Sequence, residues 1–221
     1  MDFDFSPLLS SWRFLASGLL MTLLLSVMVV TGSMILGFAI GIARAYGARW
    51  LNAALAFYVD SMRAIPVLVV LVWTFFALPI LTGVTLPPFW AAWVALTLHV
   101  GASVAEIVRA GIASVRAGQT RAALALGMSR TQVVARIVLP QAVVRMLPAF
   151  GSVLSITIKD TAIATVIAVP ELMRQSETIA AQSFRPLEVF TATMLVYFLV
   201  LFPVTRGVDA LYRRVAHRGR S

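Results

Sequence analysis

GQTRAALALGMSRTQVVARIVLP, residues 118–140, is the most informative stretch of the chain, because it lies in the longest polar break of an otherwise apolar sequence. Its first part, residues 119–126, is rich in good helix formers such as alanine and leucine. Gly127 follows, and glycine adopts without strain the left-handed conformation that commonly ends a helix. The pattern therefore predicts a short helix that stops at Gly127.

A second helix is predicted directly after this bend. Ser129 and Gln132 have the spacing of a capping box, in which the two side chains satisfy free backbone N–H groups reciprocally, and the helix is expected to run to Pro140. We call residues 119–140 the knuckle. Its bend presents Ala122, Ala123, Leu124, Leu126 and Met128. Because such an apolar tip is a liability in water, we expect it to dock on a partner or to pack on the chain's own membrane domain.

The composition places the rest of the chain in a membrane. Of its 221 residues, 60% are hydrophobic and 12% are charged, and that charged fraction is about half the value typical of soluble domains. The apolar runs that approach the roughly 20 residues needed to cross hydrocarbon are 16–43, 64–82, 89–108, 147–170 and 188–208. The first run is longer than the apolar part of a signal peptide and predicts a retained helix. With no cysteine present, disulfide and thiol chemistry are excluded. The sequence predicts an all-α membrane protein with about five transmembrane helices.

The net charge of +9 is explained by membrane topology rather than by a nucleic-acid partner. Arginines gather between the first two runs, in the loop at about 111–145 and after the last run, whereas the loops 82–88 and 171–187 carry no net charge. This is the positive-inside pattern for an N-terminus outside and a C-terminus in the cytoplasm. The expected divisions are an external segment at 1–15, a transmembrane domain at 16–212 that includes the loop at about 111–145, and a basic cytoplasmic tail at 213–221.

The spacing within the knuckle resembles the EAA loop, EAA-x3-G-x9-I-x-L-P, of ABC importer permeases. Three residues separate Ala123 from Gly127 and nine separate Gly127 from Ile137, although Arg121 stands where the pattern has glutamate. Matches in the same order over residues 15–215 extend the resemblance to the permease subunits of polar amino acid ABC importers, the histidine, glutamate, glutamine, arginine and opine type. They include Arg63-Ala64-Ile65-Pro66, Ala105-Glu106-Ile107, Gly118-Gln119, Leu139-Pro140-Gln141-Ala142, Lys159-Asp160-Thr161, Val169-Pro170-Glu171-Leu172 and Phe184-Arg185-Pro186-Leu187-Glu188.

The resemblance implies a type I ABC importer permease fold in a prokaryotic plasma (inner) membrane. Two such permeases would pair, as a homodimer or with a paralogue, on two ABC ATPase subunits that bind ATP and Mg²⁺, and a soluble amino acid-binding protein would deliver the substrate. The chain is expected to be no enzyme and to hold no cofactor, metal or catalytic residue, and it lacks the G-x-x-x-x-G-K-[ST] phosphate loop. The residues expected to couple it to the ATPase are Arg121, Ala122, Ala123, Leu126, Gly127, Met128 and Ser129.

Polar residues within the apolar runs are candidates for a substrate pathway. They are Lys159, Asp160, Thr161, Ser103 and Glu106. Charged groups at membrane depth are unfavourable unless they are paired or hydrated. Lys159 and Asp160 are adjacent on a helix and pair poorly with each other, so each is expected to meet another helix, a water-filled cavity or a zwitterionic amino acid; a structural network between helices is the alternative. Glu106 and Arg109 have i, i+3 spacing, which favours a local ion pair over a role in gating.

Two other functions fit parts of the sequence. Ser155 and Lys159 have the i, i+4 spacing of a Ser–Lys dyad, which permits an intramembrane hydrolase, although no flanking signature supports it. The buried charges also suit an ion-coupled secondary transporter, but no inverted repeat is visible. Neither alternative explains the ordered knuckle. The expected function is therefore that of a transmembrane permease subunit of an ABC importer, which moves a polar amino acid or a derivative with energy from a separate ATPase.

Overall fold

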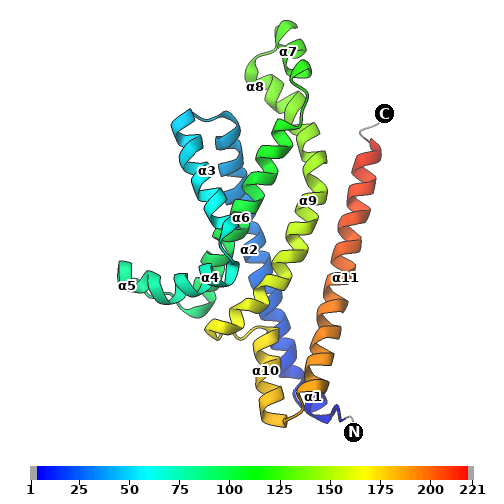
Figure 1. Ribbon diagram of the computed structural model, residues 1–221. Coiled ribbons are helices and arrows are strands. Elements are labelled where there is room, and N and C mark those ends of the chain that lie inside the picture. Colours follow the sequence, from blue (N-terminus) through cyan, green and yellow to red (C-terminus); the bar gives the residue numbers. More distant parts are fainter. Residues whose placement is uncertain (1–3, 219–221) are drawn as a thin grey trace.

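The computed structural model describes residues 4–218, and every regular element in that range is a helix arranged along one elongated bundle (Figure 1). Four helices of the described chain are long and apolar enough to cross a membrane, and a bent pair of helices makes a fifth candidate. The four are α2 (Trp12–Tyr46), α6 (Pro88–Ala113), the continuous helix Arg130–Ile167, and Pro186–Arg214 within α11 (Pro186–Arg218). The predicted all-α class and the number of spans are confirmed.

The centre of the bundle is the seam between α2 and α6, which pack together along much of their length. Small residues on α2 allow this approach. A Cβ at Gly37 would lie 2.4 Å from the Val104 side chain, and a Cβ at Gly41 would lie 2.6 Å from that of Val108. Both contacts are shorter than carbon atoms tolerate, so the two glycines set the distance between the helices.

The bent pair consists of α3 (Arg49–Ala64) and the helical segment Val67–Thr82, which meet at an angle of 107°. Ile65 forms the bend with an extended backbone, because a residue before proline is disfavoured in the helical region. The second arm contains α4 (Val67–Val72), η1 (Trp73–Ala77) and α5 (Leu78–Thr82). Arg63 lies in the last turn of α3, beside the bend.

The prediction that the second knuckle helix ends at Pro140 is wrong. The chain instead continues from α8 (Arg130–Val133) through a π-helical turn, η2 (Val134–Val138), into α9 (Leu139–Asp160). A proline ring clashes with the carbonyl four residues earlier in a regular α-helix, and the wider π turn directly before Leu139-Pro140 relieves that clash. The same arrangement occurs at Leu78-Pro79, which follows the π turn η1. The chain therefore stays helical through both Pro140 and Pro79.

The remaining elements complete the end of the bundle opposite the knuckle. α9 gives way at Thr161 to a 3₁₀ helix, η3 (Thr161–Ile167), so the predicted span 147–170 is the last part of a longer helix with a changed final turn. α10 (Leu172–Ser183) and the short α1 (Ser6–Ser10) follow at this end, together with the N-terminal part of the described chain (Figure 1). α11 then returns toward the knuckle end, and its helix includes part of the predicted tail 213–221, of which residues 219–221 lie outside the described range.

Candidate coupling loop and substrate pathway

The first helix of the knuckle ends as the sequence predicts. α7 (Ala117–Ala125) is followed by Gly127 with φ +84°, a left-handed conformation that strains any residue with a side chain. The Gly127 N–H donates to the Leu124 carbonyl at 3.0 Å, and the Met128 N–H donates to the Ala123 carbonyl at 3.2 Å. These two bonds form a Schellman motif. A Cβ at Gly127 would meet no atom within 4 Å, so its own backbone, rather than a neighbour, requires glycine.

The predicted capping box is also present. The Ser129 hydroxyl accepts a hydrogen bond from the Gln132 N–H at 3.3 Å, and the Gln132 side-chain oxygen accepts one from the Ser129 N–H at 2.8 Å. Together, the Schellman motif and the capping box fix the bend by contacts within one short segment. The knuckle is therefore a structured protrusion at the end of the bundle, as Figure 1 shows for α7 and α8.

The chain covers only part of the apolar tip. Ala123 is buried at 6% exposure and Met128 is half-buried against the core. Leu124 is 40% exposed and Leu126 is 85% exposed. Arg121, Ala122 and Ser129 are exposed as well. The alternative that the tip packs on the chain's own domain is therefore correct for Ala123 and wrong for Leu126, which residues 4–218 leave largely uncovered.

A mostly apolar groove of about 480 Å³ lies beside the tip. Its walls come from α6, α7, α8, η2 and the end of α2, and they include Ile112, Leu124 and Val133. Arg121 and Arg130 are the charged side chains that line it. The groove places two guanidinium groups near the exposed Leu124 of the tip.

Glu106 forms a three-residue ion cluster on α6 and α2. Arg109 Nε lies 3.0 Å from Glu106 Oε2, which confirms the predicted local pair. Arg44 of α2 adds a second cation, with Nη1 2.9 Å from the same oxygen, and its side chain is only 9% exposed. Local spacing could not predict this bond, because 62 residues separate the partners. Glu106 therefore ties the α2–α6 seam together.

Lys159 and Asp160 lie at the end of α9, directly before η3. Lys159 is exposed and Asp160 is half-buried in the single chain. No hydrogen bond or salt bridge joins either side chain to the rest of the described chain, so the expected partner on another helix of this chain is not found. Lys159 shares one face of α9 with the exposed Ser152 and Ile156, which leaves that face open to a second chain, to solvent or to substrate.

The structure does not bring all five pathway candidates together. Gly111 of α6 faces Met146 of α9, and the two helices run in opposite directions (Figure 1). With a rise of about 1.5 Å per residue, Glu106 is roughly 12 Å from Lys159 along the bundle axis. Ser103 is half-buried, one turn closer to Lys159 than Glu106 is. Ser103 thus fits a common pathway better than Glu106, which is engaged in its ion cluster.

Hydroxyl groups on α9 bond to their own helix. Thr161 is buried and donates to the Ile158 carbonyl at 2.8 Å. The Ser155 hydroxyl donates to the Gly151 carbonyl at 3.1 Å, so it is not paired with Lys159 as a Ser–Lys dyad requires. The geometry gives no support to the hydrolase alternative.

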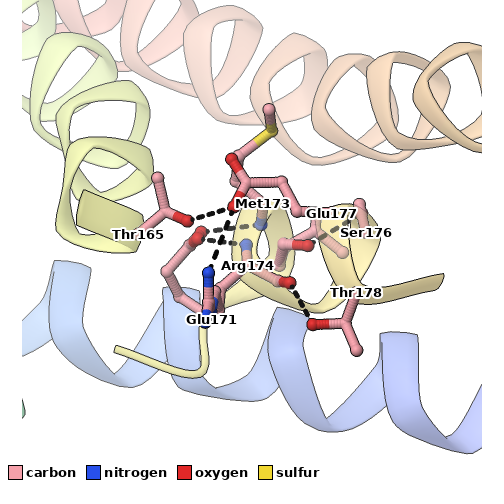
Figure 2. Close-up of polar contacts among 8 residues, drawn as sticks. Thr165, Glu171, Met173, Arg174, Ser176, Glu177 and Thr178 are labelled. Carbon is pink, nitrogen blue, oxygen red and sulfur yellow. Dashed lines mark hydrogen bonds and ion pairs between the residues drawn. The ribbon is translucent and has the colours of Figure 1, made fainter. Parts of the chain in front are cut away.

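A polar cluster that sequence reasoning missed surrounds the first turn of α10 (Figure 2). Glu171 is fully buried, and its carboxylate accepts hydrogen bonds from the N–H groups of Met173 and Arg174 at 2.9 and 2.7 Å. The hydroxyls of Thr22 on α2 and Tyr197 on α11 donate to the same carboxylate. Burial raises the pKa of Glu171, while these hydrogen bonds act in the opposite direction.

Figure 2 also shows how η3 is joined to α10 beside this cluster. The Thr165 hydroxyl donates to the Glu177 carboxylate at 2.8 Å, and Arg174 forms an ion pair with the same carboxylate. The only sequence signal was Glu171 within the Val169-Pro170-Glu171-Leu172 match, and glutamate is not a preferred N-cap residue. Its partners lie too far away in the chain to be found from local spacing.

A bundle of helices that are long and apolar enough to cross a membrane, with a structured loop at one end, has the architecture of a multi-pass membrane protein. Residues 33–218 match the family described as binding-protein-dependent transport system inner membrane component, and the chain belongs to this family.

Relatives of known function match nearly the whole chain. It is 35% identical over 216 residues to the glutamine transport system permease protein GlnP of Escherichia coli (strain K12), with 97% of this chain and 99% of that protein covered. It is 33% identical over 215 residues to the arginine transport system permease protein ArtQ of Bacillus subtilis (strain 168), with 97% and 98% covered. The predicted resemblance to amino acid ABC importer permeases is confirmed.

Solved structures show the same fold. A chain from the crystal structure of an amino acid ABC transporter with histidines superimposes with a TM-score of 0.90 at 30% identity, covering 97% of this chain and 100% of that one. A chain of the inward-facing MetNI methionine ABC transporter has a TM-score of 0.80 at 18% identity, covering 93% and 98%, and this likeness concerns the fold alone. The type I permease fold is confirmed, and no finding supports an ion-coupled secondary transporter.

Proposed function

We propose that this protein is the transmembrane permease subunit of an ABC importer for a polar amino acid or a related derivative in a prokaryotic plasma (inner) membrane. The observation that carries the proposal is the continuous helix Arg130–Ile167, which begins in the knuckle and reaches Lys159 and Asp160 before it ends. One continuous helical element thus connects the proposed docking loop with the charged residues of the membrane domain. The named relatives, which transport glutamine and arginine, support an amino acid as the substrate.

The sidedness follows from the charge distribution. With the knuckle and the C-terminal arginines in the cytoplasm, the N-terminus and α10 lie outside, in agreement with the positive-inside rule. An ABC ATPase that binds ATP and Mg²⁺ docks on the knuckle, and an amino acid-binding protein delivers substrate near α10. The chain itself performs no catalysis and holds no cofactor.

A second permease, either another copy or a paralogue, completes the pathway. The exposed face of α9 with Ser152, Ile156 and Lys159 is open in the single chain, and a charged group is poorly placed against lipid. Lys159 and Asp160 offer one cation and one anion, which suit the carboxylate and the ammonium group of an amino acid. Thr161 positions the turn between α9 and η3 through its bond to Ile158, and Ser103 approaches the pathway from α6.

Transport then follows from movement of the knuckle. Closure of the ATPase dimer on ATP displaces the bend at Gly127, and the helix that starts at Arg130 transmits the displacement to the region of Lys159 and Asp160. The paired permeases exchange inward-facing and outward-facing states around this pathway.

A comparison of two tryptophan variants tests the docking of the ATPase. Gly127→Trp and Gly83→Trp both place a bulky residue at a left-handed glycine with open space around it, but Gly83 lies at the far end of α6 from the knuckle. Tagged proteins are purified in mild detergent, and co-purifying chains are identified by mass spectrometry. Wild type and Gly83→Trp are expected to retain an ABC ATPase, whereas Gly127→Trp loses it. Retention by Gly127→Trp, or no ATPase with wild type in several detergents, would overturn the proposal.

A further inference from the structure

The knuckle carries positive charge that no acidic residue balances. No aspartate or glutamate occurs between Glu106 and Asp160, whereas Arg121, Arg130 and Arg136 lie in the knuckle. These three side chains are exposed, and the salt bridges of the described chain include none of them. Acidic residues contribute little to membrane topology. The positive-inside rule therefore explains the arginines but not the absence of carboxylates among them.

Two of these arginines are placed where docking removes water. Arg121 and Arg130 line the groove of about 480 Å³, together with Leu124. A partner that covers Leu124 and Leu126 also dehydrates the guanidinium groups in the groove. Loss of hydration strongly disfavours a charged group unless an opposite charge replaces the water. A partner that covers the two leucines must therefore also supply a negative charge to the guanidinium groups.

We propose that this groove binds an acidic segment of the ABC ATPase, with a carboxylate facing Arg121 and Arg130 beside apolar side chains, and that this charge selects the ATPase. The inference rests on the proposed function. A guanidinium group pairs with a carboxylate through two parallel hydrogen bonds, which fixes orientation as well as charge. Arg121 stands where the EAA pattern has glutamate, so an ATPase with a cation at the facing position is repelled.

Charge variants of the full chain test this inference with the ATPase identified by co-purification. Binding is measured for wild type, Arg121→Gln, Arg121→Glu and Arg49→Glu in neutral detergent and in nanodiscs with and without anionic lipid. Arg49 is an exposed arginine at the start of α3 and does not line the groove, so it controls for the change in net charge. We expect Arg121→Glu to weaken binding about tenfold or more and Arg121→Gln to weaken it about threefold, with Arg49→Glu unchanged.

A charge swap gives the second measurement. Crosslinking from the groove identifies the facing acidic residue of the ATPase, and its replacement by arginine is expected to restore binding to Arg121→Glu but not to wild type. Raising NaCl from about 50 to about 500 mM is expected to weaken the wild-type complex and to reduce the difference between wild type and Arg121→Glu.

The possible failures are distinguishable. If wild type binds no ATPase, the proposed function fails. If wild type binds and Arg121→Glu binds equally well or more tightly, the acidic partner segment is contradicted while the proposed function stands. If the variants differ only in the presence of anionic lipid, lipid headgroups occupy the groove and the inference is overturned. Equal loss with Arg49→Glu would show a general charge effect and would also overturn it.

Discussion

Ser129 in the knuckle and Glu171 at the opposite end of the bundle both cap the N-terminus of a helix, but their other contacts differ. Each is the N-cap of a helix and accepts hydrogen bonds from backbone N–H groups of the first turn. The bonds of Ser129 stay within four residues and remain exposed. Glu171 is buried, and its carboxylate also accepts hydrogen bonds from the hydroxyl groups of Thr22 on α2 and Tyr197 on α11. A local cap shapes a surface that a partner can use, whereas a cap with distant partners fixes helices to one another.

The comparison predicts that Glu171→Ala has the largest effect on the fold. The change leaves the N–H groups of Met173 and Arg174 and the Tyr197 hydroxyl without their acceptor in a buried site, and we expect it to lower the free energy of unfolding by about 3 kcal/mol. Chemical unfolding in mixed micelles measures this. Glu177→Ala, which removes a half-exposed carboxylate from the same helix, is the control and should lower it by less than about 1 kcal/mol. Equal losses of stability in the two variants would show that the buried contacts of Glu171 do not hold the helices together.

Thr22→Val should have an intermediate effect. The Thr22 oxygen accepts a hydrogen bond from the Leu172 N–H at 3.1 Å and donates to Glu171. Valine keeps the shape but leaves that buried N–H unpaired, so we expect a loss of about 1–2 kcal/mol in the same unfolding measurement. Thr22→Ser preserves the hydroxyl and should retain most of the stability. If serine and valine behave alike, packing rather than hydrogen bonding accounts for Thr22.

Gly127→Ala should separate coupling from stability. Alanine at φ +84° introduces backbone strain on the order of 1 kcal/mol at the bend, and Gly83→Ala introduces a similar strain at φ +72° far from the knuckle. Both variants are expected to unfold at similar denaturant concentrations. Only Gly127→Ala should reduce the stimulation of ATP hydrolysis by the permease, measured with the reconstituted complex. Reduced stimulation in both variants would contradict a specific role for the bend.

Ser129→Ala should have the smallest effect. Loss of the cap destabilises a helix by about 1 kcal/mol or less at an exposed site, and the change should be confined to the knuckle. Hydrogen exchange should quicken at residues 130–133 without a change at α10. Ser129→Asp retains a hydrogen-bond acceptor at the N-cap, so the amides of residues 130–133 should exchange at the wild-type rate in this variant. Faster exchange at α10 in Ser129→Ala would show that the two ends of the bundle are not independent.

The knuckle was predictable because its determinants are close in sequence. Gly127, Ser129 and Gln132 specify the bend through bonds that span five residues or fewer. Apolar run length likewise predicted the spans, since membrane thickness imposes it. The ion pair between Glu106 and Arg109 followed from the spacing of one helical turn.

The errors and omissions come from tertiary structure. Pro140 was expected to end a helix, but a π turn accommodates it. Arg44 reaches Glu106 across 62 residues, and Thr22 reaches Glu171 across 149. Local patterns carry no information on such pairs. The roles of Lys159 and Asp160 in binding substrate stay predictions, because no hydrogen bond or salt bridge joins either side chain to the rest of the described chain.

Uptake into proteoliposomes is the measurement that shows whether the protein is the permease of an ATP-driven importer. The permease is reconstituted with its co-purifying ATPase, radiolabelled polar amino acids are supplied with the binding protein outside, and ATP is enclosed or omitted. The proposed function predicts uptake that requires enclosed ATP and the ATPase, persists when ion gradients are collapsed, and is lost with Gly127→Trp but not with Gly83→Trp. Uptake by the permease alone, driven by an ion gradient and indifferent to ATP, would contradict it.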